Sequence, residues 1–321
     1  MTASNKNITK HFITTKILII AIAITTVLAS LSYLIFSSQF SKNSSSTTTE
    51  IVAEKTEASP FGGHVHALAI NGETNDIFLG ARPVYRSVDG GLNWESIPIP
   101  KLEPRANITS ITIDSKNPKI MYATGHGIAV AKSTDGGKTW ETKNSGLVGI
   151  STEALAIDVQ DSNKIYVWVL GDGIYRSKNA GESWGRVDDG PKNQEIRTLA
   201  SVNLPTGMGG IWLYAGTDVG ALKSPDCFCG WDKLPNEGLP TGKRVYSISA
   251  DNNSHGTVYA GLRDGVYKTT DEGKTWKHLT NIPEDAVVAV HPKNSNIVYA
   301  VGSDGKLFTS DDAGKNWQLI K

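Results

Sequence analysis

Six copies of one eight-residue motif constrain the fold of this chain more strongly than any other feature of its sequence. The motif reads Ser/Thr-x-Asp-x-Gly-x-x-Trp, and its tryptophans lie 46, 44, 47, 45 and 41 residues apart by subtraction of their numbers. A period of this length is typical of an array or closed ring built from one supersecondary unit. The third and eighth positions of the six copies are Asp89 and Trp94, Asp135 and Trp140, Asn179 and Trp184, Asp226 and Trp231, Asp271 and Trp276, and Asp312 and Trp317.

Each copy, called the box below, lies between two short apolar segments and is expected to form the turn of a β-hairpin. The Ser or Thr hydroxyl and the Asp carboxylate accept hydrogen bonds from amides within the turn. The glycine supplies a positive φ that other residues adopt only at a cost, and the tryptophan fills space against a neighbouring sheet. Because six of the eight tryptophans occupy this position, we interpret them as structural rather than as carbohydrate-stacking residues.

The segments between the boxes also repeat, as short runs of branched and aromatic residues separated by Gly, Asn, Asp and Pro. This pattern indicates four short strands per unit. It therefore predicts an all-β fold over residues 61–321, a single six-bladed β-propeller with four-stranded antiparallel blades. The first and last units each contain their own four strands, so we expect the ring to close by sheet packing without an exchanged strand. The alternative is an additional outer strand from Thr49–Ala53.

The N-terminal region has a different composition. Residues 17–36 carry no charge, three lysines precede them and Lys42 follows them. Twenty apolar residues are long enough to cross a membrane, and the lysines favour a cytoplasmic N-terminus. We predict a cytoplasmic segment 1–16, a transmembrane anchor 17–36 and a Ser/Thr-rich linker 37–60, with the propeller periplasmic or extracellular. The alternative is a cleaved signal peptide.

Charge and cysteine content exclude some functions. The chain has 32 basic and 32 acidic residues, so it has no electrostatic footprint for nucleic acid. Its two cysteines, Cys227 and Cys229, lie in the fourth box. An exported domain allows a local disulfide. The alternatives are two free thiols or a thiolate pair that binds a soft metal such as Cu(I).

One face of the predicted propeller is more varied than the rest. It carries the loops that enter the first strand of each unit and the loops between second and third strands, whereas the boxes lie on the opposite face. Variation between repeats is expected where a site has been built on a scaffold. The candidate ligand- or partner-binding residues of this rim face are His64, His66, Arg82, Arg105, His126, Asp172, Arg197, Asp218, Arg244, Tyr246 and Arg263.

Three kinds of chemistry are open to these residues. His64, His66 and His126 suit Zn²⁺ or Cu²⁺ if they converge. Glu153, Asp172, Glu195 and Asp218 are candidates for the carboxylate pair of a glycoside hydrolase, with Glu153 and Glu195 preferred. Arg105, Arg197 and Arg244 can instead bind an anionic group or a peptide carboxylate.

The six boxes resemble the Asp-box repeat, also called the bacterial neuraminidase repeat, and the resemblance covers nearly all of residues 61–321. It is specific for the fold and poor for function, because sialidases, xyloglucanases, sortilin-type receptors and photosystem II stability/assembly factors share it. The opening His64–Leu68 is similar to that of exported repeat proteins called glycosyl hydrolases. The Arg-Ile-Pro opening of sialidases is absent, and xyloglucanases use two larger propellers. The resemblance in size and blade style is nearest to the assembly factors, which contact a client protein through an arginine-rich face.

No complete catalytic motif accompanies the mixed charges of the rim. The sequence therefore favours a membrane-anchored, non-catalytic propeller outside the cytoplasm that binds a protein or peptide. The alternative is a glycoside hydrolase that uses Glu153 and Glu195 and takes a glycan. A weaker alternative is a Cu- or Zn-binding protein.

Overall fold

The computed structural model describes Phe61 and residues 64–100, 106–204, 206, 210–254, 256–282 and 284–321. The predicted anchor and linker, the alternative outer strand Thr49–Ala53, and Arg105 lie outside these residues. Among the described residues, no helix has the length and apolar character needed to cross a membrane. The segment boundaries proposed before residue 61 therefore stay predictions.

Twenty-four strands in the described part of the chain form six antiparallel sheets, and each sheet consists of four strands that are consecutive in sequence. We call the sheets blades one to six. Their strands are β1 (Ala67–Ile70), β2 (Ile77–Gly80), β3 (Val84–Ser87) and β4 (Glu95–Ile97); β5 (Asn107–Ile113), β6 (Met121–His126), β7 (Ala129–Ser133) and β8 (Glu141–Thr142); β9 (Thr152–Ile157), β10 (Ile165–Val169), β11 (Gly173–Ser177) and β12 (Gly185–Asp188); β13 (Ile196–Val202), β14 (Trp212–Thr217), β15 (Ala221–Pro225) and β16 (Asp232–Lys233); β17 (Val245–Ala250), β18 (Val258–Leu262), β19 (Gly265–Thr269) and β20 (Lys277–Leu279); β21 (Val287–His291), β22 (Asn294–Val301), β23 (Leu307–Ser310) and β24 (Gln318–Leu319).

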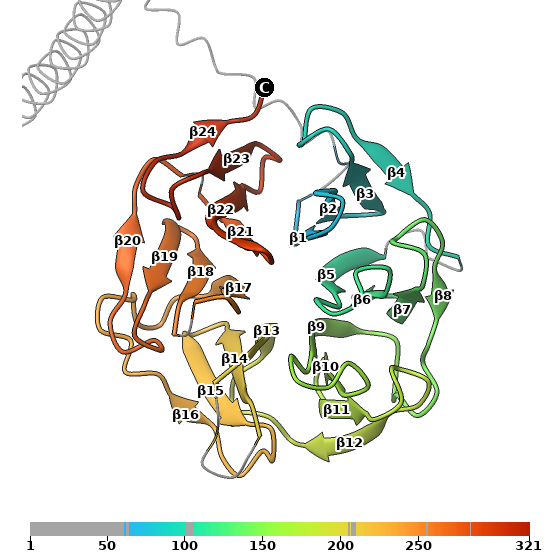
Figure 1. Ribbon diagram of the computed structural model, residues 1–321. Coiled ribbons are helices and arrows are strands. Elements are labelled where there is room, and N and C mark those ends of the chain that lie inside the picture. The colour runs from blue at the N-terminus through green and yellow to red at the C-terminus, as the bar shows by residue number, and fades with distance from the viewer. Residues whose placement is uncertain are drawn as a thin grey trace, which may run out of the picture. The chain divides into compact units, whose positions relative to one another are not determined.

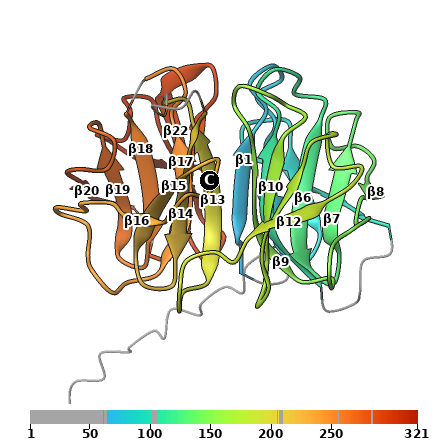
Figure 2. The same cartoon turned by 90° about the horizontal axis from the view of Figure 1, so that it is seen from below.

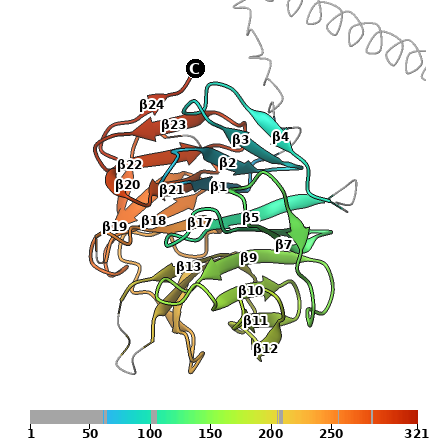
Figure 3. The ribbon, with the colours of Figure 1, turned by 45° about the vertical axis from the view of Figure 1, so that its right-hand side comes forward.

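The blades are arranged as a ring, which confirms the predicted six-bladed propeller. The first strand of each blade surrounds the central axis, and the fourth strand lies at the perimeter (Figure 1). Figure 3 shows the first strands of successive blades following one another around that axis. Strands such as β1 and β9 are buried along their whole length. Burial on both faces explains why they read as nearly continuous apolar runs.

Blades one and six close the ring by side-chain packing. Leu68 and Ile70 of β1 share an apolar cluster with Val287 of β21. Beside this cluster, His291 Nε2 lies 2.9 Å from Asn75 Oδ1. No described strand of one blade joins the sheet of another, so the expected closure without strand exchange is confirmed for the described residues.

The second box illustrates how the repeated motif shapes its turn. The Ser133 hydroxyl accepts a hydrogen bond from the Gly137 amide at 2.9 Å, and Asp135 Oδ1 accepts one from the Thr139 amide at 2.9 Å. Gly137 has a φ of 84°. Trp140 is 5% exposed, and its Nε1 donates to the Gly137 carbonyl. The box is thus a hairpin turn in which the predicted role of each residue is confirmed.

Boxes also join neighbouring blades. The Tyr122 hydroxyl of blade two donates to the Ala180 carbonyl in the third box at 2.8 Å. Tyr259 of blade five does the same to Ala313 in the sixth box at 3.2 Å. A Cβ added to Gly137 would overlap the Phe78 ring of blade one. The glycine therefore also permits close approach of the preceding blade.

The fourth box departs from this pattern. Cys227 and Cys229 form a disulfide, which confirms the predicted local disulfide, so their sulfurs do not offer the thiolate pair that a Cu(I) site requires. Phe228, between them, has a φ of 54°. Its ring centroid lies 5.7 Å from that of Tyr166 in blade three. Ring packing here takes the place of the hydroxyl–carbonyl contact found at other blade junctions.

Candidate functional site

The strands run between two faces of the ring, which Figure 2 shows edge-on. The boxes lie on one face. The loops after β2, β6, β10, β14, β18 and β22 lie on the other, together with the segments that enter the first strands. This second face is the rim face defined above, and it carries the candidate residues that the structure describes.

Glu153 on β9 is the centre of a charged cluster near the axis. Its Oε1 accepts a hydrogen bond from Arg197 Nη1 at 2.9 Å and lies 2.8 Å from His126 Nε2. The residue is 8% exposed. Because His126, Glu153 and Arg197 come from blades two, three and four, the cluster ties three blades together. A carboxylate that accepts both contacts through one oxygen is fixed in orientation.

His64 and His66 lie beside this cluster, with ring centroids 6.4 Å apart. Burial, and then the neighbouring His64, lower the pKa of His66. Its imidazole is therefore neutral at neutral pH. His126 is paired with Glu153. In the part of the chain that the structure describes, no three His, Cys, Asp or Glu side chains are grouped as ligands for a metal ion.

The remaining arginines are more scattered. The Arg244 guanidinium lies 5.9 Å from the Tyr246 ring centroid. Burial, and then a hydrogen bond to Asp285, raise the pKa of Tyr246. The structure thus brings Arg197 toward the axis, whereas Arg82, Arg244 and Arg263 are exposed.

An acidic cavity of about 330 Å³ lies between blades three and four. This volume is at the small end of the range found for ligand sites. Its lining includes the carboxylates of Asp172, Asp189, Glu195 and Asp218, with the Trp168 indole beside them. The four carboxylates come from the loops that follow β10, β12 and β14.

Two of the four carboxylates are paired with Arg186 on β12. Its Nη1 lies 2.7 Å from Asp189 Oδ1, and its Nε lies 3.3 Å from Asp172 Oδ2. The Tyr175 hydroxyl also donates to Asp172 Oδ2 at 2.7 Å. These contacts make Asp172 and Asp189 part of the cavity wall.

Glu195 and Asp218 form no ion pair with another described residue, and they are locked to each other through the backbone. The Glu195 amide donates to Asp218 Oδ1 at 3.2 Å, and the Asp218 amide donates to the Glu195 carbonyl at 3.3 Å. Trp168 Nε1 donates to Glu195 Oε2 at 3.0 Å. Each carboxylate is therefore oriented through one oxygen, while its other oxygen has no hydrogen-bond partner among the described residues.

The two glutamates of the predicted carboxylate pair have different surroundings. Glu153 is committed to Arg197 and His126, and it does not line the acidic cavity. Glu195 does line it, but its neighbour there is Asp218. Sequence position suggested Glu153 because it and Glu195 lie where two adjacent first strands begin. The partners that each glutamate finds in space decide the pairing instead.

Trp168 is the residue of this cavity that the sequence interpretation missed. It is 3% exposed, and a Cβ on Gly190 would overlap its ring. The loop that follows β12 and contains Gly190 therefore lies directly against the indole. The signal was present in the repeat, because the other blades have only small or branched side chains at this position of the second strand, namely Gly80, Thr124, Gly216, Gly261 and Val301.

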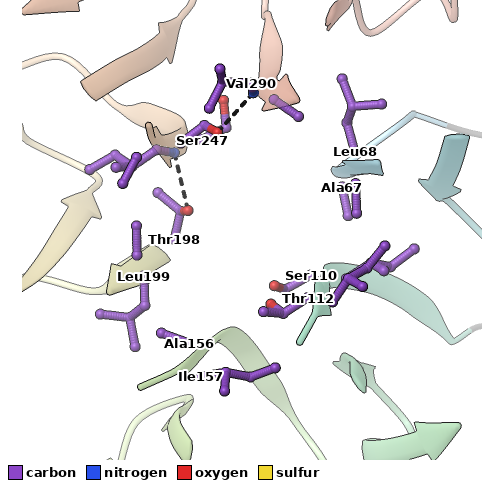
Figure 4. Close-up of a pocket in the computed structure, with 18 of the residues that line it drawn as sticks. Ala67, Leu68, Ser110, Thr112, Ala156, Ile157, Thr198, Leu199, Ser247 and Val290 are labelled. Carbon is purple, nitrogen blue, oxygen red and sulfur yellow. Dashed lines mark hydrogen bonds between the residues drawn. The ribbon is translucent and has the colours of Figure 1, made fainter. Parts of the chain in front are cut away.

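A second cavity, of about 240 Å³, follows the axis. Figure 4 shows side chains from all six first strands converging on it. Several hydroxyls here join one blade to the next: Thr112 donates to the Leu155 carbonyl at 3.1 Å, and Thr198 accepts from the Ile248 amide at 3.2 Å. These hydroxyls are used for structure. The charged residue that this cavity has at its rim end is Arg197.

Comparison with known proteins supports the repeat and the fold. The family model of the BNR/Asp-box repeat matches residues 131–142, and that of sortilin, neurotensin receptor 3, matches residues 264–321. A Paenibacillus xyloglucanase is 26% identical over 237 residues, covering 67% of this chain and 22% of the relative. A Hypocrea jecorina xyloglucanase is 27% identical over 199 residues, covering 60% of this chain and 22% of the relative. The alignments thus span about a fifth of these relatives.

Solved structures share the fold at lower identity. The GH74 enzyme of Niastella koreensis superposes with a TM-score of 0.58 at 18% identity, covering 80% of this chain and 45% of that one. YCF48 bound to D1 peptide superposes with a TM-score of 0.50 at 18% identity, covering 82% and 83%. These likenesses concern the propeller itself.

The sequence relatives overturn one expectation. The chain was expected to be a non-catalytic propeller that binds a protein or peptide. Its curated relatives are xyloglucanases, including an oligoxyloglucan-reducing end-specific enzyme of Emericella nidulans that aligns over 82% of this chain. These relatives contradict the non-catalytic expectation and favour its alternative, a glycoside hydrolase.

Proposed function

We propose that this protein is a glycoside hydrolase that uses Glu195 and Asp218 and acts on a β-glucan of the xyloglucan class. The observation that carries the proposal is the acidic cavity. Two carboxylates there have no ion-pair partner among the described residues and are each oriented through one oxygen. The similarity to xyloglucanases supports the choice of substrate.

Glycoside hydrolysis requires two carboxyl groups on opposite sides of the scissile bond. One, as the acid, protonates the leaving glycosidic oxygen, and the other, as a carboxylate, activates water or attacks the anomeric carbon. Glu195 and Asp218 supply this pair. Arg186 holds Asp172 and Asp189 in the wall of the cavity, so these two carboxylates do not compete for the sugar ring. The anchor predicted for residues 17–36 would hold the enzyme at the outer surface of the membrane.

The direct test is the release of reducing ends from xyloglucan and mixed-linkage β-glucan by the purified chain. Glu195→Gln and Asp218→Asn should each lower kcat/KM by about 10²–10⁴-fold, the contribution typical of a general acid or base. Asp304→Asn is the matched control, because Asp304 is a rim carboxylate of blade six that is paired with Lys306. It should keep wild-type activity.

A second measurement separates the two roles. Azide added to a glycine variant at the nucleophile or base position should restore turnover, whereas it should not replace a general acid acting on a poor leaving group. Wild-type activity in the Glu195→Gln variant would refute the assignment. The absence of hydrolysis of any β-glucan by the wild-type chain would refute the proposed function.

A further inference from the structure

The charged cluster of His126, Glu153 and Arg197 has no part in the proposed acid–base pair. We propose that Glu153 and Arg197 form a separate sugar subsite, which binds vicinal hydroxyls of a neighbouring unit in the same glycan. This inference rests on the proposed function for the identity of its ligand. It assigns to the axis end of the rim face a binding role that the acidic cavity does not supply.

The free hydrogen-bonding groups of this cluster match a diol. Glu153 uses Oε1 for both of its contacts, and Oε2 has no partner among the described residues. Arg197 donates through Nη1 and its Nε is buried without a partner among the described residues, so its other Nη N–H groups are the donors left for a ligand. An acceptor and donors therefore lie side by side. A sugar hydroxyl both donates and accepts, so adjacent hydroxyls can donate to Glu153 and accept from Arg197.

The charges of the cluster favour a neutral ligand. The Glu153 carboxylate and the Arg197 guanidinium are in direct contact and offset one another. An isolated anion would be repelled by Glu153, and an isolated cation would be repelled by Arg197. Burial keeps His66 beside them neutral. A polyol satisfies the free acceptor and donors without adding a charge to a poorly solvated site.

The cluster is rigid before any ligand arrives. The side chains of Glu153 and Arg197 are 10% and 23% exposed, and they come from different blades. Groups held by the scaffold lose little freedom on binding, which favours affinity. By contrast, an exposed arginine such as Arg263 would have to be ordered first.

The placement of the cluster fits a chain that begins in the acidic cavity. Arg197 follows Glu195 by two residues, a span of about 6–7 Å in an extended segment. Arg197 lines the axial cavity, whereas Glu195 lines the acidic one. A glycan with one unit at Glu195 would therefore reach the Glu153–Arg197 pair with a following unit, toward the axis.

Binding should then depend on chain length. We would use the full chain carrying Glu195→Gln, so that ligands are not hydrolysed, and measure Kd by calorimetry for β-glucan oligosaccharides of two, four and six sugars. Longer ligands should bind more tightly. Adding Arg197→Gln should raise the Kd of the longer ligands about tenfold. This is the size expected for the loss of one hydrogen bond to a charged group. Adding Arg263→Gln, which makes the same charge change on blade five, should leave the gain intact.

The outcomes distinguish this inference from the proposed function. If the wild-type chain hydrolyses β-glucan but Arg197→Gln keeps the full gain with length, the subsite is wrong and the enzyme assignment stands. If the gain depends on Arg197 but the wild-type chain hydrolyses nothing, the subsite stands without the enzyme. If no oligosaccharide binds and the wild-type chain hydrolyses nothing, both proposals are wrong.

A second readout covers the case in which the Arg197 variant fails to fold. In the otherwise unmutated Glu195→Gln chain, the imidazole proton resonances of His66, beside the cluster, should shift when the six-sugar ligand binds. The resonances of His278, whose Nε2 lies 2.9 Å from the Asp264 carbonyl on blade five, should not. Unchanged His66 resonances at saturating ligand would overturn the subsite.

Discussion

Two buried tryptophans make the same kind of contact on opposite faces of the ring. Trp140 is 5% exposed and donates its indole N–H to the Gly137 carbonyl of its own box. Trp168 is 3% exposed and donates to the Glu195 carboxylate of the next blade. The first contact recurs around the ring, and the second occurs where blade three departs from the repeat. The repeated contact stabilises the propeller, whereas the contact of Trp168 belongs to the acidic cavity on which the proposed function rests.

Replacing Trp140 should have the largest effect on stability. Trp140→Ala should lower the free energy of unfolding by about 3–5 kcal/mol, because a large buried side chain is deleted and a cavity remains. Denaturant unfolding followed by circular dichroism measures this change. A midpoint equal to that of the wild-type chain would show that the box tryptophans do not stabilise the ring.

Replacing Glu153 tests whether a rim residue can also be structural. Glu153→Ala leaves Arg197 without its carboxylate and should cost about 2–3 kcal/mol of stability. This is less than for a fully buried pair, because Arg197 and His126 keep some contact with solvent. The same unfolding assay applies, with Arg263→Gln as the control. A stability equal to wild type would mean that the cluster contributes only to binding.

Replacing Trp168 should affect turnover more than stability. Trp168→Phe keeps an aromatic ring in the cavity but removes the hydrogen bond that orients Glu195. We expect kcat to fall about tenfold with KM little changed, which corresponds to about 1.4 kcal/mol at the transition state. Steady-state kinetics on β-glucan measure both constants. An unchanged kcat would mean that the indole does not position Glu195.

The smallest effect should appear in acid. The Asn93 amide, and then the Asn93 and Ser87 side chains, hold the pKa of Asp89 down at about 2. Since this value is below the usual one, Asp89 stabilises the fold above about pH 4, and that stabilisation is lost as the pH falls toward 2. Asp89→Asn should reduce the loss over this window. Unfolding curves at pH 5, 3.5 and 2.5 give the dependence of the free energy of unfolding on pH. An identical dependence in the wild-type and Asp89→Asn chains would contradict the stabilising role of Asp89.

The fold could be predicted because its determinants are local and repeated. Each box specifies its own turn through a hydroxyl, a carboxylate and a glycine that are close in sequence, as Ser133, Asp135 and Gly137 illustrate. Six copies of the box at one period are then compatible with only a few architectures. Closure of the ring without strand exchange could be predicted from the same count of strands, because the first and last units each contain four.

The candidate site could be predicted only in part, because its contacts join separate loops. The rim face and Glu195 were identified from the alignment of repeats. Asp218 was among the candidate carboxylates but was not preferred as the partner of Glu195. The sequence does not show that the Glu195 amide binds Asp218, or that Glu153 contacts His126 and Arg197 from two other blades. Trp168 was overlooked because the six box tryptophans dominated the interpretation, although its position is small or branched in every other blade.

The closure of the ring has a consequence for how such a chain can change over evolution. No described strand of one blade is laddered into another sheet, and blades one and six meet through apolar side chains and the contact between Asn75 and His291. A blade can therefore be duplicated, deleted or moved to the other end of the gene as one continuous segment, without breaking a backbone ladder. The number of blades in the ring is then set by the angle between neighbouring blades. The rim loops can diversify independently of that number.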